Sequence, residues 1–121
     1  MKHRKTGRQL SRTADQRKAL MKTMLGSLVL HERITTTEAK AKEMKNFIDP
    51  LVNKAKTART EEGKKVAVIR DLRKSLPLMA IRKLIGEFGE RFSTRGSGYV
   101  RITKLQPRKS DSARMAVIEF V

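Results

Sequence analysis

Apolar residues recur every three or four positions through the first three quarters of the chain, which predicts a largely helical region. The first helix is predicted to follow Thr13, because Thr13 and Gln16 have the spacing of a capping box, and to end near His31. Its apolar stripe consists of Leu20, Met21, Met24, Leu25, Leu28 and Val29. Residues 1–12 have neither helical nor strand periodicity, so they are predicted to form an extended arm.

A β-branched run over 33–37 predicts a short strand, after which Thr36 or Thr37 caps a second helix. The buried side of that helix is expected to carry Ala41, Met44, Phe47, Ile48, Leu51, Val52 and Ala55. Pro50 falls within this pattern and removes a backbone hydrogen bond, so the helix is either kinked near Asn46 or split in two. We favour the kink because the apolar spacing keeps its phase across the proline.

Two shorter helices are predicted beyond a polar, turn-like segment at 57–63. The third helix covers 64–75 and turns Val66, Val68, Ile69 and Leu72 inward. Pro77 is typical of the first turn of a fourth helix, whose expected stop is Gly89. The inner face of this fourth helix consists of Ile81, Leu84, Ile85 and Phe88.

From residue 92 onward the period changes from that of a helix to that of a strand. A loop at 93–98 leads into a strand at 99–105, in which Val100 and Ile102 alternate with the polar Arg101. The polar segment 106–112 then predicts a hairpin longer than the two-residue type. The last strand, at 114–121, is apolar on both faces, which is typical of a more central or better covered strand.

The composition of the chain shows a large excess of positive charge. The 121 residues include 29 Lys and Arg against 12 Asp and Glu, which gives a net charge of +17. Such charge is typical of a protein that binds a polyanion, and nucleic acid is the leading candidate. The chain has no cysteine and its apolar stretches are too short to cross a bilayer, so we expect a soluble intracellular protein without a membrane partner. An organellar transit peptide is the alternative explanation of the basic start.

The sequence gives little support to an enzyme. His3 and His31 have no neighbouring set of metal ligands, and the glycine and lysines at 63–65 lack the rest of a phosphate-binding loop. The paired acidic residues lie among Lys and Arg, whose charges they balance. We therefore expect no catalytic residue, no metal, no cofactor and no small-molecule substrate.

Two basic regions favour RNA binding. The first joins the arm to the first helix, and its candidate residues are Lys2, His3, Arg4, Lys5, Arg8, Gln9, Arg12, Arg17, Lys18 and Lys22. The second lies within 91–114, where seven Lys or Arg accompany one acid, and its candidates are Arg91, Arg95, Tyr99, Arg101, Lys104, Arg108 and Lys109. Tyr99 either stacks on a base or packs at the domain edge. The low aromatic content argues against a sheet that reads single strands, so contacts to the phosphate backbone and to RNA shape are predicted.

Motifs along the whole chain point to a family. They include Met1-Lys2-His3-Arg4-Lys5, Leu25-Gly26-Ser27-Leu28-Val29, Ile34-Thr35-Thr36-Thr37, Asp49-Pro50-Leu51, Phe88-Gly89-Glu90-Arg91-Phe92 and Gly98-Tyr99-Val100-Arg101-Ile102. Together they resemble the seventeenth protein family of the bacterial large ribosomal subunit. That resemblance implies a cytoplasmic, structural constituent of the ribosome, bound to large-subunit ribosomal RNA beside neighbouring large-subunit proteins near the polypeptide exit side.

The same resemblance implies an α+β fold, in which a small three-stranded sheet packs with about four helices. Combined with the pattern above, this divides the chain into an extended basic arm at 1–12 and a single RNA-binding domain at 13–121. We expect the arm to become ordered only when RNA neutralises it. A DNA-compacting protein and a scaffold that uses its charge only for solubility are the competing hypotheses.

Overall fold

The computed structural model describes residues 8, 10 and 12–121. Within them lie five α-helices, a short 3-10 helix and three strands. In chain order they are α1 (Ala14–His31), β1 (Arg33–Thr37), α2 (Glu38–Thr60), η1 (Glu62–Lys64), α3 (Lys65–Leu72), α4 (Leu78–Ile85), α5 (Glu87–Glu90), β2 (Val100–Lys104) and β3 (Met115–Phe120). The fold is α+β, which confirms the predicted class.

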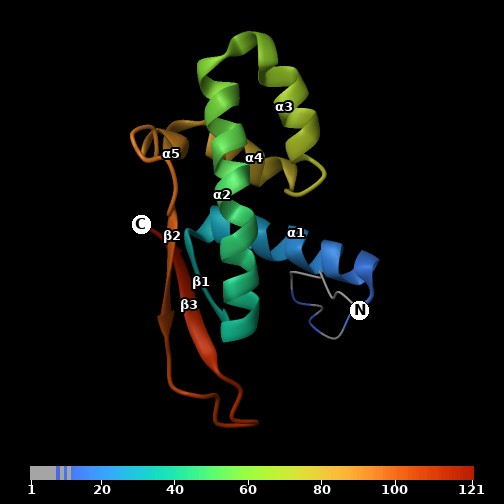
Figure 1. Ribbon diagram of the computed structural model, residues 1–121, viewed down its shortest axis with the longest axis vertical. Coiled ribbons are helices and arrows are strands. Elements are labelled where there is room, and N and C mark those ends of the chain that lie inside the picture. The colour runs from blue at the N-terminus through green and yellow to red at the C-terminus, as the bar shows by residue number, and fades with distance from the viewer. Residues whose placement is uncertain (1–7, 9, 11) are drawn as a thin grey trace, which may run out of the picture.

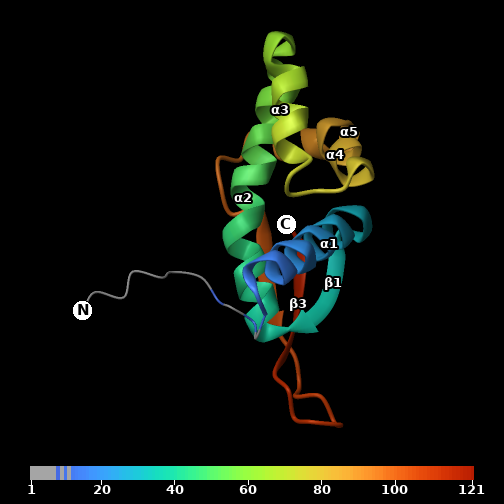
Figure 2. The ribbon, with the colours of Figure 1, turned by 90° about the vertical axis from the view of Figure 1, so that its right-hand side faces the viewer.

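The three strands form one antiparallel sheet in the order β1-β3-β2. The last strand is therefore central, as its apolar character on both faces predicts. One face of the sheet packs against α2 and contributes Ala116, Ile118 and Phe120 to the core. Figures 1 and 2 show the β2–β3 hairpin projecting beyond the helices at one end of the molecule, while α3 and the end of α2 lie at the other.

Helix α1 begins where its capping signal predicts. The Thr13 hydroxyl accepts a hydrogen bond from the Gln16 backbone N–H at 3.4 Å, and the Gln16 side chain accepts one from the Thr13 N–H at 3.3 Å. The helix ends at His31, and its C-cap residue Glu32 has a left-handed φ of 66° and a backbone N–H that donates to the Leu28 carbonyl. Both ends are thus fixed by local contacts, which is why the sequence locates them well.

Helix α2 is continuous through Pro50, so the predicted alternative of two separate helices is wrong. It also runs to Thr60, where a turn was expected at 57–63. Ala58 is buried near the end of the helix, and packing of this kind extends a helix beyond what its polar residues indicate. Phe47 was expected to be buried, yet 46% of its surface is exposed.

The region after α2 differs from the sequence prediction in its boundaries. The third helix is shorter than predicted, and its residue Val66 is 62% exposed instead of buried. The predicted fourth helix is divided at Gly86 into α4 and α5, so the expected stop at Gly89 lies inside α5. A Cβ on Gly89 would lie 1.9 Å from the Leu84 carbonyl oxygen, so this crossing of the two helices requires glycine.

Candidate nucleic-acid interface

The described residues of the arm contact the domain. The Arg8 guanidinium lies 3.3 Å from the carboxylate of Glu43, which is 4% exposed, and the Arg8 backbone N–H donates to the same oxygen. Leu10 packs against the core, and the Arg12 guanidinium donates to the Leu10 carbonyl at 2.6 Å. The boundary predicted at Thr13 therefore marks the start of α1, whereas contacts with the core begin earlier. Arg8 neutralises a buried acid, which limits its availability for RNA.

Five predicted contact residues of the arm lie outside the described residues. They are Lys2, His3, Arg4, Lys5 and Gln9. Their role in RNA binding remains a prediction from the sequence.

The cations at the start of α1 form no ion pairs within the described part of the chain. Lys18 and Lys22 are exposed, Arg12 and Arg17 are partly exposed, and none of the four forms a salt bridge with a described residue. A cation without an acidic partner loses no ion pair when it meets a phosphate. This surface is therefore better prepared to bind an anion than a surface of the same charge whose cations are paired.

The second basic region is different, because most of its cations already form salt bridges with acidic side chains. The pairs are Arg91 with Glu32 at 3.4 Å, Arg101 with Glu119 at 2.9 Å, Lys104 with Glu38 at 3.7 Å and Arg108 with Asp111 at 2.8 Å. Lys109 is exposed and forms no salt bridge with a described residue. A phosphate that approaches this region has to compete with the protein's own carboxylates for most cations.

Two of these residues have evident structural roles. Arg91 donates to the backbone carbonyls of Phe120 and Val121, so its guanidinium attaches the last strand to α5. Lys104 lies beside the Glu38 carboxylate, whose pKa is lowered by a hydrogen bond from Lys42 and by the positive charges of Lys104 and Arg114. Arg91 and Lys104 therefore each balance the charge of a carboxylate of the protein itself.

The hairpin loop is closed by a two-pronged ion pair. The Arg108 Nε and Nη2 atoms donate to the two carboxylate oxygens of Asp111 at 3.0 and 2.8 Å, and the Ala113 N–H donates to Asp111 at 3.1 Å. The hydrogen bond from Arg108, followed by that from Ala113, lowers the pKa of Asp111 to about 2, and the same pair raises the pKa of Arg108. Asp111 therefore stays ionised, and able to pair with Arg108, at pH values well above 2.

The pKa of Asp111 provides a test of this loop geometry. Since the folded-state pKa lies below the ordinary 3.8, the carboxylate stabilises the loop fully above that value and ceases to do so as the pH falls through about 2. We expect the carboxyl carbon of Asp111 to titrate near pH 2 by NMR in the wild-type chain, and nearer 3.8 in the Arg108→Ala variant. A wild-type midpoint close to 3.8 would show that the ion pair does not form in solution.

Tyr99 has to be removed from the candidate contacts. Its side chain is fully buried, against Phe92 with a ring-centroid distance of 5.4 Å. Its hydroxyl hydrogen-bonds to Asn53 and to the Arg95 carbonyl, and it accepts from Lys56. A ring enclosed in this way cannot stack on a base, and it lies in the core instead of at the domain edge, which was the other predicted alternative. Arg95 itself is exposed on the loop that these bonds attach to α2.

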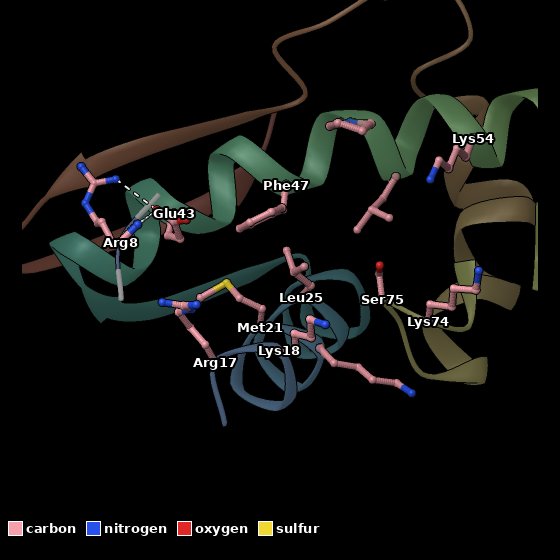
Figure 3. Close-up of a pocket in the computed structure, with 13 residues that line it drawn as sticks. Arg8, Arg17, Lys18, Met21, Leu25, Glu43, Phe47, Lys54, Lys74 and Ser75 are labelled. Carbon is pink, nitrogen blue, oxygen red and sulfur yellow. Dashed lines mark hydrogen bonds and ion pairs between the residues drawn. The ribbon is translucent and has the colours of Figure 1, made fainter. Parts of the chain in front are cut away.

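A groove between α1 and α2 brings together residues that the sequence did not single out. It has a volume of about 980 Å³, and its lining includes Lys18 and Lys22 from the predicted set together with Phe47, Lys54 and Lys74 (Figure 3). One feature of the sequence could have indicated that Phe47 lines a groove. Phe47 lies about 40° around the helix from Leu51 and hence at the edge of the apolar stripe. Lys74 reaches the groove only through the turn after α3, which no local pattern indicates.

The described residues contain no helix that is both long enough and apolar enough to span a membrane. They also contain no cluster of three or more His, Asp or Glu side chains arranged to hold a metal ion.

The chain matches a known protein family. The model of the family described as Ribosomal protein L17 matches residues 20–121 of this 121-residue chain. The matched segment contains most of α1, the whole sheet and the hairpin, and it leaves outside the arm and the first residues of α1, among them Lys18 of the groove.

Proposed function

Because this chain belongs to the ribosomal protein L17 family, we propose that it binds large-subunit ribosomal RNA mainly through the cations of its arm and of α1. The members of this family are structural proteins of the large ribosomal subunit, a class without enzymatic activity. Membership also places the protein in the cytoplasm, in the ribosome, together with ribosomal RNA and other ribosomal proteins. The proposal concerns which residues make the RNA contacts.

The observation that carries the proposal is the contrast between the two basic regions. Arg17, Lys18 and Lys22 have no acidic partner among the described residues, and they continue the basic run of the arm. Contact with phosphates releases the counterions that such a surface holds, and this release favours binding. In this proposal residues 1–12 are an RNA-binding arm, and residues 13–121 are the domain that positions it. The arm contacts include Lys2, His3, Arg4, Lys5 and Gln9.

The second region has a supporting role in the proposal. Lys109 and Arg95 supply exposed charge without a salt bridge to the described residues, at the hairpin and at the loop before β2. Arg91, Arg101, Lys104 and Arg108 add weaker contacts because each already meets a carboxylate. We also propose that the protein neighbours lie near the polypeptide exit side, a placement supported by the sequence resemblance alone.

A competition experiment tests the proposed RNA preference. The purified chain is bound to labelled large-subunit ribosomal RNA and displaced at one salt concentration by unlabelled ribosomal RNA or by duplex DNA. We expect DNA to require roughly a thousandfold higher concentration, the lower end of the usual gap between specific and non-specific binding. Equal displacement by the two polymers would instead support a DNA-compacting protein, and salt has to be matched because it changes both affinities steeply.

A further inference from the structure

The floor of the groove between α1 and α2 is apolar and incompletely covered. Phe47 projects from α2 toward Met21 and Leu25 of α1, and the two α1 side chains are buried while the phenylalanine ring is 46% exposed (Figure 3). Folding has therefore left an aromatic face accessible inside a concave site. Concave sites with an apolar floor and a few polar groups at the margin are the usual form of a binding site.

The margins of the groove are positively charged. Lys18 and Lys22 of α1 stand on one side, and Lys54 of α2 with Lys74 from the α3–α4 connection lies near one end. Lys54 pairs with Asp71 at 2.7 Å, whereas the other three lysines form no salt bridge with a described residue. The one acid in the lining, Glu43, is neutralised by Arg8 at the opposite end. The groove thus attracts anions.

We propose that this groove binds an unpaired nucleotide segment of RNA, with one base stacked on Phe47 and the adjacent phosphates held by Lys18, Lys22 and Lys74. A nucleotide combines a planar face and an anionic charge in one unit, which matches an aromatic ring between cations. The groove also adjoins the α1 cations to which RNA binding is assigned above, so this inference rests on the proposed function and specifies one site within it.

The first test measures whether the aromatic ring contributes to single-strand binding. The full chain and its Phe47→Ala variant are titrated with single-stranded octauridylate and with an eight-base-pair RNA duplex. We expect the substitution to weaken octauridylate binding roughly tenfold, which corresponds to about 1.4 kcal/mol, within the range of one lost stacking contact. Duplex affinity and the salt dependence of both reactions should stay unchanged because no charge is removed.

Val66→Ala is the matched control, since Val66 is another exposed apolar residue on a helix and lies outside the groove. It should leave both affinities unchanged. Equal octauridylate affinity in the wild type and the Phe47→Ala variant would overturn the inference. So would a wild-type chain that does not bind octauridylate. Either result leaves the competition between ribosomal RNA and DNA to decide the proposed function separately.

The second test identifies the chemical class of the ligand. The chain contains no tryptophan, so a Phe47→Trp variant carries a single indole placed in the groove. We expect octauridylate to quench its fluorescence by stacking, and an octaglutamate peptide to leave it nearly unchanged. Quenching by octaglutamate and not by octauridylate would assign the groove to an acidic peptide and contradict the proposal.

Discussion

Replacing Lys2, Arg4 and Lys5 together by alanine is expected to weaken binding to large-subunit ribosomal RNA by roughly ten- to a hundredfold. Each cation that contacts a phosphate contributes about 0.7 to 0.9 to the slope of log affinity against log salt concentration. Loss of three contacts should therefore reduce that slope by roughly two to three. Filter binding or fluorescence anisotropy at several salt concentrations measures both quantities.

The choice of residues separates binding from stability. Arg8 and Arg12 are retained because Arg8 neutralises the buried Glu43 and Arg12 hydrogen-bonds to the Leu10 carbonyl. The triple variant should then change the free energy of unfolding by less than about 0.5 kcal/mol. The matched control replaces Lys65, Arg70 and Arg73, three exposed cations at or beside α3 without a salt bridge to a described residue. An equal change of slope in both triple variants would refute a specific role for the arm.

Gly89→Ala is expected to destabilise the fold more than any surface substitution discussed above. The new Cβ would lie 1.9 Å from the carbonyl oxygen of Leu84 and 3.3 Å from the side chain of Arg59. Backbone has to move to relieve this contact, so α4 and α5 can no longer pack as they do. We expect a loss of about 3 kcal/mol in the free energy of unfolding and a fall of roughly 10 °C in melting temperature.

Gly96→Ala controls for the general effect of replacing a glycine. A Cβ at Gly96 meets no atom within 4 Å, and the residue lies in the exposed loop before β2. Its melting temperature by circular dichroism should equal that of the wild type to within a few degrees. If Gly89→Ala melted at the same temperature as Gly96→Ala, the close packing of α4 against α5 would be wrong.

The sequence predicts those parts of the fold that depend on local signals. The capping box at Thr13 locates the start of α1, and the apolar character of β3 places it at the centre of the sheet. Phe47 was assigned to the wrong environment because its position at the edge of the apolar stripe fits both a buried and an exposed ring. Only the distance between α1 and α2 decides between them.

The candidate interface was predictable as a charge distribution but not as a set of available cations. Arg8 meets Glu43 across 35 positions of sequence, and Arg91 meets Glu32 across 59. Pairing over such separations depends on the tertiary fold, so counting charges along the chain overestimates the second region. Tyr99 was ambiguous for the same reason, since its burial depends on contacts with α2 that no local pattern reveals.

Lysine acetylation footprinting, read by mass spectrometry, tests most directly whether the proposed cations face RNA. Assembled large subunits and the free chain are acetylated in parallel, and the same subunits are treated again after ribonuclease digestion. We expect Lys2, Lys5, Lys18 and Lys22 to be protected in the intact subunit and to become reactive once the RNA is removed, while Lys65 reacts in every sample. Full reactivity of Lys18 and Lys22 in the intact subunit would contradict the proposed RNA contacts, and so would protection that survives ribonuclease.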